Sequence, residues 1–480
     1  MQSKEKKFYL ALDLGASSGK MVLGKYDGSV LDTELIHEFP NGGIEVGGNL
    51  YWDILQLFNQ IKKGLKKVSQ KTGNDLQSVG VDTWGVDYGL LDQNDQLLSN
   101  PYHYRDQRTE GLMEEVIQKA GREAIYQKTG IEFIFFNTLY QLYADYKYRP
   151  HVLDNAQSLL FTPDLLNYFL CGEKYNEYTI ASTSQLFNPR TESWVDSLLQ
   201  ELNLPRDIFA DLIHPGQKIK KISPAIQREC RLNSDVQVTS VGSHDTESAL
   251  AAVPFESPES SVFLSSGTWS LLGMELDEPL INEQSLQKNF TNECGVGQKI
   301  AFLKNLCGLW LIQECRRSWN REGQDLSYGQ IDRAARRARG NKFIIDPNEE
   351  RFKNPADMPR EIKEYCRETK QPVPENYGQM ARGIYESLAL SYKKVITDLE
   401  ELLDKKITTV NIVGGGCRSE MLNQMTAEIT GLRVVTGPVQ ATALGNILAQ
   451  LMAAGKISDL KEGRELIRNS VELKEYTPGD

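Results

Sequence analysis

The stretch Val241-Gly242-Ser243-His244-Asp245-Thr246-Glu247-Ser248 lies near the middle of the 480-residue chain, between a predicted strand and a predicted helix. Residues 235–241 before it are rich in β-branched side chains at alternate positions, which is typical of a strand. Residues 248–253 after it are mostly small, and Pro254 is expected to end this short helix. A carboxylate at a strand-to-helix junction stands where catalytic groups of α/β sheets usually lie. From these residues alone, Asp245 is either a catalytic group or a cap of the following helix.

Length and composition restrict the class of protein. A chain of 480 residues favours two domains, and 40% hydrophobic with 25% charged residues is ordinary for a globular protein. The net charge of −11 disfavours nucleic acid or an anionic membrane as the main partner. With no signal peptide and no long apolar run, we expect a cytoplasmic protein. The seven cysteines and five histidines are scattered, which disfavours a zinc site or a disulfide framework.

The amino terminus predicts a hairpin with a glycine-rich turn. Residues 8–14 form a nearly continuous apolar run interrupted by Asp13, residues 21–26 form a second predicted strand, and residues 30–39 form a third. The turn Gly15-Ala-Ser-Ser-Gly-Lys20 joins the first two. A phosphate-binding P-loop would have four residues between its glycines and a helix after its lysine, so this turn is a different kind of loop.

This turn is nevertheless suited to phosphate. Its glycines let backbone N–H groups converge on an anion, Ser17 and Ser18 add hydroxyl donors, and Lys20 adds positive charge. Asp13 at the end of a buried strand is costly unless it is paired or bound to a cation. The alternative is a tight hairpin in which Asp13 caps its own turn.

Polar and aromatic residues occur together in three segments that suit a sugar pocket. A predicted strand over residues 78–85 carries Asp82 and leads to Asp87, and further groups of this kind lie at residues 102–106 and 133–138. Isolated aromatic residues belong more often to a core than to a binding site, so the core remains the alternative for each segment.

The second half repeats the pattern of the first. Residues 261–265 and 269–274 are predicted strands, and the small-residue turn 266–268 joins them. A strand, a turn of glycine and hydroxyl residues, and another strand therefore occur once in each half. This repetition suggests two related domains that each offer a hairpin to a shared ligand.

A second glycine-rich loop follows the predicted strand over residues 409–413. Gly414-Gly-Gly-Cys417 leads into a predicted helix over residues 419–430, and three glycines allow close backbone approach to a flat group such as adenine. This favours nucleotide contact over a purely structural turn. Residues 441–451 are rich in small side chains, which predicts a helix packed tightly beneath this loop.

The remaining pattern predicts helices elsewhere and one irregular region. Residues 347–374 are rich in proline and charge and predict irregular surface structure. Helices are predicted over residues 52–68, 162–171, 195–202 and 381–403, and from residue 306 onward.

Taken together, these motifs resemble those of the FGGY carbohydrate kinases, over nearly the whole chain from about residue 8 to residue 455. The segments that carry the resemblance are Asp13-Leu-Gly-Ala-Ser-Ser-Gly-Lys20, Val81-Asp-Thr-Trp-Gly-Val-Asp87, Phe136-Asn-Thr-Leu-Tyr-Gln-Leu142, Ser243-His-Asp-Thr246, Leu264-Ser-Ser-Gly-Thr-Trp-Ser270 and Asn411-Ile-Val-Gly-Gly-Gly-Cys417. The resemblance implies an α/β fold of two actin-like ATPase (ribonuclease H-like) domains with a catalytic cleft between them. We expect the domains to span residues 1–246, with the sugar site, phosphate loop and catalytic Asp, and 247–480, with the nucleotide site.

Within the family, the motifs are most similar to those of kinases that act on L-rhamnulose. This implies transfer of the ATP γ-phosphoryl group to O1 of L-rhamnulose, with Asp245 as general base and with Mg²⁺ oriented by Asp13 through water. The nucleotide-binding positions that the resemblance implies are Ala16, Ser17, Ser18, Gly19, Lys20, Thr268, Gln313 and Gly415. The substrate-binding positions that it implies are Gly85, His244, Asp245, Thr246 and Asn305.

One residue departs from the family pattern, and two alternatives stay open. Lys20 stands where many relatives have arginine, which keeps the charge but loses the bidentate fork. One alternative is a kinase for another ketose, L-fuculose or D-xylulose, and the other is an actin-like or chaperone-like ATPase. The expected partners are therefore the small molecules ATP and L-rhamnulose, with no nucleic acid or membrane, in a monomer or small homo-oligomer.

Overall fold

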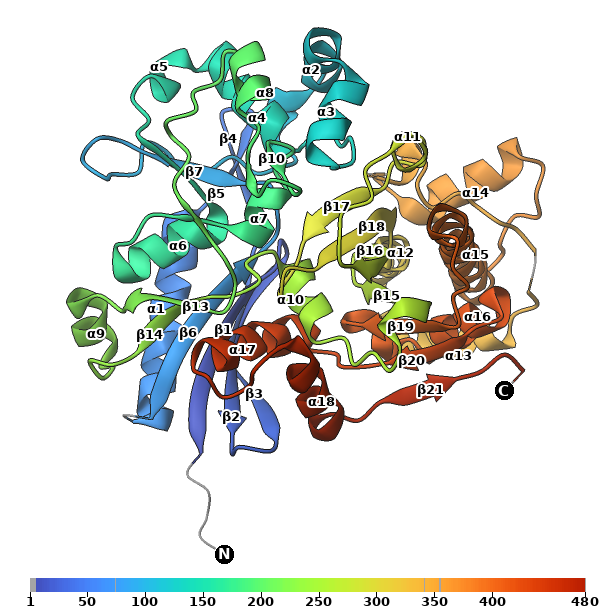
Figure 1. Cartoon of the computed structure of the whole chain (residues 1–480). Helices are drawn as coiled ribbons and strands as arrows, with labels where there is room; N and C mark the ends of the chain where they lie inside the picture. The colour runs from blue at the N-terminus through green and yellow to red at the C-terminus, as the bar shows by residue number, and fades with distance from the viewer. Residues whose placement is uncertain (1–5, 74, 341, 354, 480) are drawn as a thin grey trace, which may run out of the picture. The chain divides into compact units, whose positions relative to one another are not determined.

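The hairpin at the amino terminus lies within a six-stranded sheet of the computed structural model, which describes residues 6–73, 75–340, 342–353 and 355–479 (Figure 1). The strands β1 (Lys7–Leu14), β2 (Ser18–Tyr26) and β3 (Leu31–Pro40) pair antiparallel, as the hairpin pattern predicts. On its other side β1 pairs in parallel with β6 (Leu76–Thr83), and β6 pairs in parallel with β14 (Gln237–Ser240). The edge strand β13 (Gln217–Lys221) is antiparallel to β14, so the order is β13-β14-β6-β1-β2-β3.

The described residues divide into two compact units, each built from several segments. The first comprises the chain up to Ala252 together with Leu276–Phe302 and Ala441–Ser470. The second comprises Val253–Glu275, Leu303–Gln440 and the residues from Val471 on. The domain boundary after residue 246 stays a prediction.

The sheet of the second unit has a closely similar plan. Its hairpin is β15 (Ser261–Ser266) and β16 (Trp269–Leu276), and β15 pairs in parallel with β19 (Thr409–Val413). Beyond β19 come β20 (Arg433–Thr436), parallel, and β21 (Lys474–Tyr476), antiparallel, while β18 (Ile300–Cys307) is next to β16. The order β18-β16-β15-β19-β20 therefore corresponds to β3-β2-β1-β6-β14, so the repeated hairpin begins a repeated sheet.

The first unit contains most of the remaining elements. Four two-stranded sheets pair β4 (Gly43–Val46) with β5 (Asn49–Trp52), β7 (Tyr88–Leu91) with β8 (Ser158–Phe161), β9 (Asn176–Glu177) with β12 (Leu212–Ile213), and β10 (Phe187–Asn188) with β11 (Ser193–Trp194). The strand β17 (Thr291–Cys294) is fully buried. The helices are α1 (Ile54–Thr72), η1 (Gln107–Thr109), α2 (Leu112–Ala120), α3 (Arg122–Thr129), α4 (Thr138–Tyr148), α5 (Pro150–Leu153), α6 (Thr162–Cys171), α7 (Tyr178–Ser182), α8 (Asp196–Glu201), α9 (Pro224–Cys230), α10 (Asp245–Ala251), α11 (Glu283–Gln287), α17 (Ala441–Ala453) and α18 (Leu460–Ser470).

The second unit has a long helix, α15 (Tyr377–Leu403), which packs against α13 (Tyr328–Arg337) and α16 (Glu420–Thr430). Its other helices are η2 (Pro258–Ser260), α12 (Trp310–Arg321), η3 (Glu350–Phe352), α14 (Met358–Glu368) and η4 (Gly415–Arg418).

The helix α17 comes from the end of the chain but packs against the sheet of the first unit. Figure 1 shows this red helix across the blue strands β1 and β6, and both strands contact it. Its main helical partner is α10, and an added Cβ on Gly445 would lie 1.7 Å from the Ser248 carbonyl oxygen. Tight packing is thus confirmed, but the partner is α10 with the sheet, while the glycine loop expected above this helix belongs to the second unit.

Three local predictions need correction. The first helix begins at Ile54, because Trp52 pairs in β5 and the Asp53 side chain caps the helix by accepting from Gln56 N. The segment from residue 306 begins as the end of β18, and its helix begins only at Trp310. Residues 347–374 are not wholly irregular, because they contain η3 and the helix α14.

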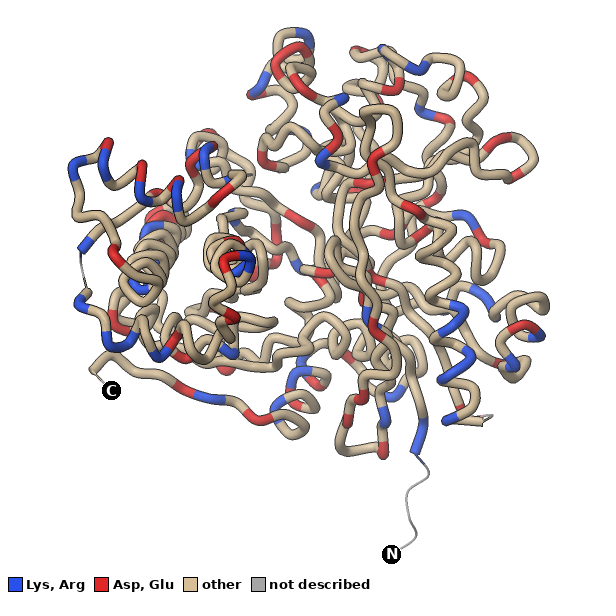
Figure 2. Tube along the Cα trace, turned by 180° about the vertical axis from the view of Figure 1, so that it is seen from behind, with Lys and Arg blue, Asp and Glu red and all other residues tan. Residues whose placement is uncertain are grey.

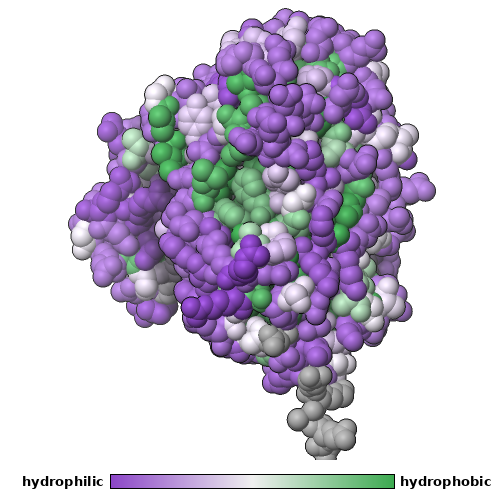
Figure 3. Space-filling view, turned by 90° about the vertical axis from the view of Figure 1, so that its left-hand side faces the viewer, coloured by the Kyte–Doolittle hydropathy of each residue, from purple (hydrophilic) through white to green (hydrophobic). Residues whose placement is uncertain are grey.

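The surface carries both charge signs (Figure 2), and apolar atoms reach it on the face shown in Figure 3. Figure 2 shows acidic and basic residues interspersed along the trace, and Lys62 and Lys66 of α1 both pair with Glu229 of α9. Figure 3 shows apolar atoms surrounded by polar ones on the side where α6 and α9 lie in Figure 1. In the first unit, α1 and α6 bring the rings of Phe58 and Phe169 to 5.3 Å between centroids. Among the described residues, no helix has the length and apolar character needed to cross a bilayer.

Candidate active site

Asp245 lies just beyond the carboxyl end of β14, where the chain enters α10. Thr83 at the end of β6 donates its N–H to the Ser243 carbonyl at 2.9 Å, which holds the ends of β6 and β14 together. Asp245 is the first residue of α10, and the N-cap is His244, whose side chain makes no capping bond. The structure therefore does not support the interpretation of Asp245 as a helix cap. Its side chain is 32% exposed and can be reached by a small molecule.

Asp245 belongs to a cluster of three carboxylates in the first unit. Asp13 of β1 and Asp82 of β6 are register partners across parallel strands, and Asp13 faces Lys20 across the hairpin. Burial raises the pKa of Asp13 to about 6, with Lys20 acting to lower it and Asp245 to raise it. Burial also raises the pKa of Asp82 well above its usual range, and the charges of Asp13 and Asp245 add to this effect. The register of β1 and β6 and the bond from Thr83 N to the Ser243 carbonyl place the three carboxylates at the same end of neighbouring strands.

The sequence leaves Asp82 open between a sugar pocket and the core, and the structure brings it to the carboxylate cluster. Its Oδ2 accepts a 2.6 Å hydrogen bond from Asn446 Nδ2 of α17, and Asn446 also donates to the Gly80 carbonyl at 3.1 Å. Asp82 is fully buried, and its Oδ1 has no hydrogen-bond partner in the part of the chain that the structure describes. A buried carboxylate oxygen left open in this way fits a cation better than a purely structural role. The sequence gives no sign of Asn446, which comes from 364 residues further along the chain.

The predicted phosphate loop is a tight turn between β1 and β2. Gly15 N donates to the Ser18 carbonyl at 3.0 Å, and Asn41 Nδ2 donates to the Gly15 carbonyl at 2.9 Å. A Cβ on Gly19 would lie 2.3 Å from the Phe39 ring, so only glycine fits there without displacement of that ring. Ser17 is exposed, and Ala16, Ser18 and Lys20 are partly exposed, so this loop can be reached by an anion.

In the first unit, the residues predicted to bind the sugar lie either next to Asp245 or next to a group of buried aromatic and polar side chains around Asp87. The Asp87 carboxylate is buried and accepts from Trp52 Nε1 at 2.6 Å, Trp84 Nε1 at 2.9 Å and Gln141 Nε2 at 2.8 Å. Asp87 therefore orders aromatic side chains and is not free for a ligand. Gly85, two residues earlier, packs against Thr183, and a Cβ there would lie 3.2 Å from the Thr183 hydroxyl. Thr246 is buried beside Asp245, to whose Oδ1 its hydroxyl donates at 3.4 Å.

His244 lies between two carboxylates, one of which the sequence analysis missed. Its Nε2 is 3.5 Å from Asp245 Oδ1, and its Nδ1 is 3.1 Å from Glu293 Oε2 of β17. Ligand atoms of His244, Glu247 and Glu293 all lie within 4.8 Å of one another. Glu293 follows Asn292 in a short buried strand, and nothing in the sequence indicates that it faces His244.

Four of the predicted ligand-binding residues belong to the second unit, and three of them lie close together around the turn between β15 and β16. Thr268, in the turn between β15 and β16, donates to Gln313 Oε1 of α12 at 3.2 Å. The glycine loop packs on the same turn, because a Cβ on Gly416 would lie 2.0 Å from the Ser266 hydroxyl and one on Gly415 would lie 3.9 Å from the Ser266 carbonyl. Asn305 lies on β18 and is partly exposed.

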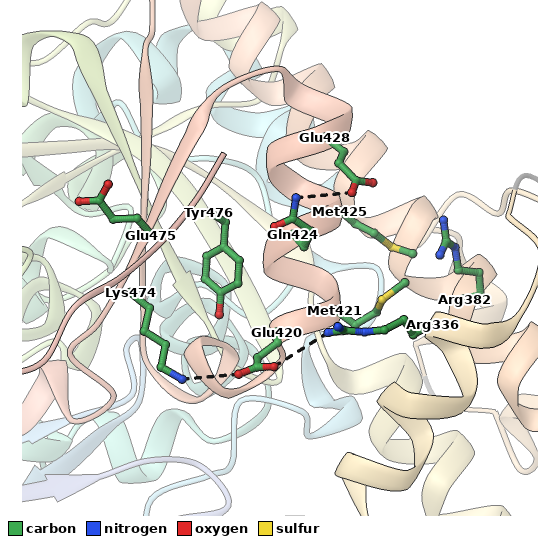
Figure 4. A pocket seen from close by; sticks show the side chains of 10 residues that line it. All are labelled: Arg336, Arg382, Glu420, Met421, Gln424, Met425, Glu428, Lys474, Glu475 and Tyr476. Carbon is green, nitrogen blue, oxygen red and sulfur yellow. Dashed lines mark hydrogen bonds and ion pairs between the residues drawn. The ribbon is translucent and has the colours of Figure 1, made fainter. Parts of the chain in front are cut away.

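A cavity of about 670 Å³ in the second unit lies along α16 and contains none of the predicted residues. Figure 4 shows that Glu420 of α16 pairs with Lys474 of β21 and with Arg336 of α13. Lys474 lies 3.5 Å and Arg336 3.9 Å from the Glu420 carboxylate. Since the cavity lies along α16 and β21 and contains none of the predicted residues, it adds nothing to the candidate site.

The family follows from comparison with known proteins. The model of the N-terminal domain of the FGGY family of carbohydrate kinases matches residues 8–252, and the C-terminal domain model matches residues 262–454. The chain belongs to the FGGY family of carbohydrate kinases. A rhamnulokinase of Bacteroides thetaiotaomicron is 43% identical over 475 residues, covering 99% of this chain and 96% of the relative. A rhamnulokinase of Halalkalibacterium halodurans is 41% identical over 473 residues, covering 98% and 99%.

A solved structure supports the fold of this FGGY kinase. The ligand-bound xylulose kinase of Lactobacillus acidophilus superposes with a TM-score of 0.80 at 18% identity, covering 98% of this chain and 94% of that chain. The family resemblance and the α/β fold of two domains are thus confirmed. Membership of a family of ATP-dependent sugar kinases also makes the actin-like or chaperone-like alternative the less favoured one.

Proposed function

We propose that the protein transfers the γ-phosphoryl group of ATP to O1 of L-rhamnulose, giving L-rhamnulose 1-phosphate and ADP. The observation that carries this proposal is the partly exposed Asp245 carboxylate at a strand end, beside Asp13, Asp82 and the phosphate loop. The named activity of relatives more than 40% identical over nearly the whole chain supports L-rhamnulose as the sugar. Other ketoses, L-fuculose and D-xylulose, are the less favoured alternatives.

In this reaction Asp245 is the general base. Its carboxylate accepts the proton of the O1 hydroxyl as the bond from O1 to the γ-phosphorus forms and the bond to the bridging oxygen of ADP breaks. Burial raises the pKa of Asp245, while His244 acts to lower it and so favours the ionised form that can accept a proton. Gly85, His244, Thr246 and Asn305 are the proposed sugar contacts.

Positive charge and backbone N–H groups hold the nucleotide. Ala16, Ser17, Ser18, Gly19 and Lys20 are proposed to bind the phosphates, and Thr268, Gln313 and Gly415 to bind the rest of ATP. The residues of the first unit fit Mg²⁺, because Asp13 and the open Oδ1 of Asp82 supply the oxygen ligands that this ion prefers, directly or through water. When bound, the ion would neutralise charge on the phosphates.

The metal proposal predicts a specific change in the Asp13→Asn variant. Loss of this carboxylate should raise the Mg²⁺ concentration for half-maximal activity by about tenfold or more. The measurement is a Mg²⁺ titration of ADP release at saturating ATP and ketose. Asp32→Asn, on the exposed side of β3, removes a charge of the same kind and should leave the titration unchanged. An unchanged titration in Asp13→Asn would count against Asp13 as the residue that orients the ion.

The substrate proposal predicts the outcome of a ketose panel. ADP release should be fastest with L-rhamnulose, much slower with L-fuculose, D-xylulose or glycerol, and lost in every case when Mg²⁺ is removed. A higher kcat/KM with another ketose would replace the sugar but keep the enzyme class. ADP release at the same rate without any sugar would contradict kinase function itself.

The remaining features of the proposed enzyme are less specific. We propose that it works in the cytoplasm, where its co-substrate ATP is held, and that its partners are small molecules. Its oligomeric state, monomer or small homo-oligomer, stays a prediction.

A further inference from the structure

Glu293 is a buried acidic group that the mechanism above does not use. It is 5% exposed on β17, a strand whose four residues are all buried. A buried carboxylate is costly unless it is paired, so its partner should reveal its role. That partner is His244 Nδ1, which is 3.1 Å from Glu293 Oε2. In the described parts of the chain neither atom makes a hydrogen bond, so this contact is an ion-pair distance.

The backbone of His244 is fixed independently of its side chain. His244 N donates to Thr179 Oγ1 at 3.1 Å, and Thr179 Oγ1 donates to Glu177 Oε2 at 2.6 Å. Ser243 N also donates to Glu177 Oε2, at 3.3 Å. The position of the main chain is therefore set by Glu177, while the Glu293 carboxylate lies beside the imidazole ring. Loss of Glu293 should leave the chain in place and free the ring.

The ring connects Glu293 to the proposed base. With Nδ1 toward Glu293 and Nε2 3.5 Å from Asp245 Oδ1, the imidazole stands between two carboxylates. Burial alone would lower the pKa of His244, but the charges of Glu293 and Asp245 raise it above its ordinary value. A protonated imidazole would therefore lie between two carboxylates, with Nδ1 nearer to Glu293 and Nε2 nearer to Asp245.

Other charged groups lie around this arrangement. Besides the cation Lys20, which acts on Asp13, further acidic groups surround His244 and Asp245. Those groups, besides the two carboxylates that the ring joins, are Asp13, Asp82, Glu177 and Glu247.

We propose that Glu293 is a positioning residue for phosphoryl transfer, which orients His244 so that its Nε2–H faces the Asp245 carboxylate. This inference rests on the proposed function of Asp245 as base. Glu293 touches neither substrate, and it acts through His244, whose proton keeps Asp245 ionised and pointed toward the O1 hydroxyl. The arrangement of a carboxylate, an imidazole and the reacting group resembles in its logic the orienting carboxylate of a serine protease triad, although His244 here assists a carboxylate base.

The first test is the Glu293→Gln variant, which keeps the shape of the side chain and removes its charge. We expect kcat with L-rhamnulose to fall about 10- to 100-fold, with the KM for ATP changed less than about twofold. Glu293→Asp, which keeps the charge on a shorter side chain, should recover part of this loss. Glu386→Gln is the matched control, because Glu386 is 3% exposed on α15 of the second unit, and its kcat should equal that of the wild type.

The second test observes the imidazole directly. The chain has five histidines, which can be labelled with ¹⁵N. In the wild type at pH 7, the His244 ring should show two protonated nitrogens. The signals are assigned by their loss in His244→Gln, and Glu293→Gln should shift them to those of a neutral ring. The wild-type spectrum depends neither on catalysis nor on the variant, so it remains informative if Glu293→Gln folds poorly or if another sugar is the substrate.

Three results would overturn the proposal. The first is a wild-type kcat in Glu293→Gln, and the second is a neutral His244 in the wild-type spectrum. The third is a stoichiometric divalent metal in purified wild-type protein that is absent from Glu293→Gln, because His244, Glu247 and Glu293 would then be metal ligands. Failure of the proposed function is distinct, since wild-type protein would then phosphorylate none of the ketoses.

Discussion

Asp245→Asn should lower kcat for ketose phosphorylation by about 100- to 10,000-fold, because an amide cannot accept the proton of the attacking hydroxyl. The KM for ATP should change little, since the proposed nucleotide contacts lie on other residues. The fold should be retained, because burial raises the pKa of Asp245 and the neutral amide avoids the cost of a buried charge beside Asp13 and Asp82. The measurements are single-turnover phosphorylation, equilibrium ATP binding and thermal unfolding of the variant.

The same substitution separates the two interpretations that the sequence left open. Asparagine caps helices about as well as aspartate, so a purely capping role predicts nearly normal turnover in Asp245→Asn. Asp53→Asn is the matched control, since Asp53 caps α1 through a 2.9 Å bond from Gln56 N and should be replaced without effect on activity or stability. Turnover of Asp245→Asn within tenfold of the wild type would exclude Asp245 as the base.

The sheets were predictable from the sequence because their signals are local. The apolar runs of β1 and β15 and the glycine turns after them indicate hairpins without knowledge of the rest of the chain. Their parallel neighbours also carry clear strand patterns. The same rule missed β18 (Ile300–Cys307), where Lys304 and Asn305 interrupt the apolar residues and the last two residues were predicted to begin a helix. Pairing with β16 decides between strand and helix here, and pairing is not a local property.

The helix α14 was missed because composition concealed its periodicity. Pro359 lies in its first turn, where proline is tolerated, and the Asp357 side chain caps it. Met358, Ile362 and Cys366 recur every four residues and are buried, which is the pattern of an amphipathic helix. The prolines and charged residues around these three apolar positions led to the prediction of irregular structure.

The residues of the candidate site were predictable only where they stand at the end of a strand that the sequence itself indicates. Asp13 and Asp245 stand at strand ends, which is a signal that the sequence carries. Asp82 was noticed, but only the register of β1 and β6 brings it opposite Asp13. Glu293 and Asn446 reach the site from segments far along the chain, and their neighbours in sequence say nothing of the groups that they face.

Gly445→Ala tests how the end of the chain supports this site, and two effects of opposite sign decide the result. Alanine in a helix is favoured over glycine by about 0.5–1 kcal/mol. At this position, however, its Cβ would lie 1.7 Å from the Ser248 carbonyl oxygen and 2.7 Å from its carbon, both backbone atoms of α10. No side chain can rotate to make room, so α17 must move away from α10. Overpacking of this kind costs about 1–3 kcal/mol or more, and crowding should therefore outweigh helix propensity.

Gly445→Ala should thus lower the free energy of unfolding, whereas Gly329→Ala in α13 should raise it slightly. Gly329 is also helical, but the nearest atom to an added Cβ there is the Arg333 Nη1 at 3.5 Å, the end of a flexible side chain. Activity should fall as well in Gly445→Ala, because the next residue, Asn446, holds Asp82 at 2.6 Å and moves with the helix. Thermal unfolding and kcat/KM of both variants check these signs. A Gly445→Ala variant as stable as Gly329→Ala would mean that α10 and α17 do not pack this closely, and the anchoring of Asp82 by Asn446 would lose its support.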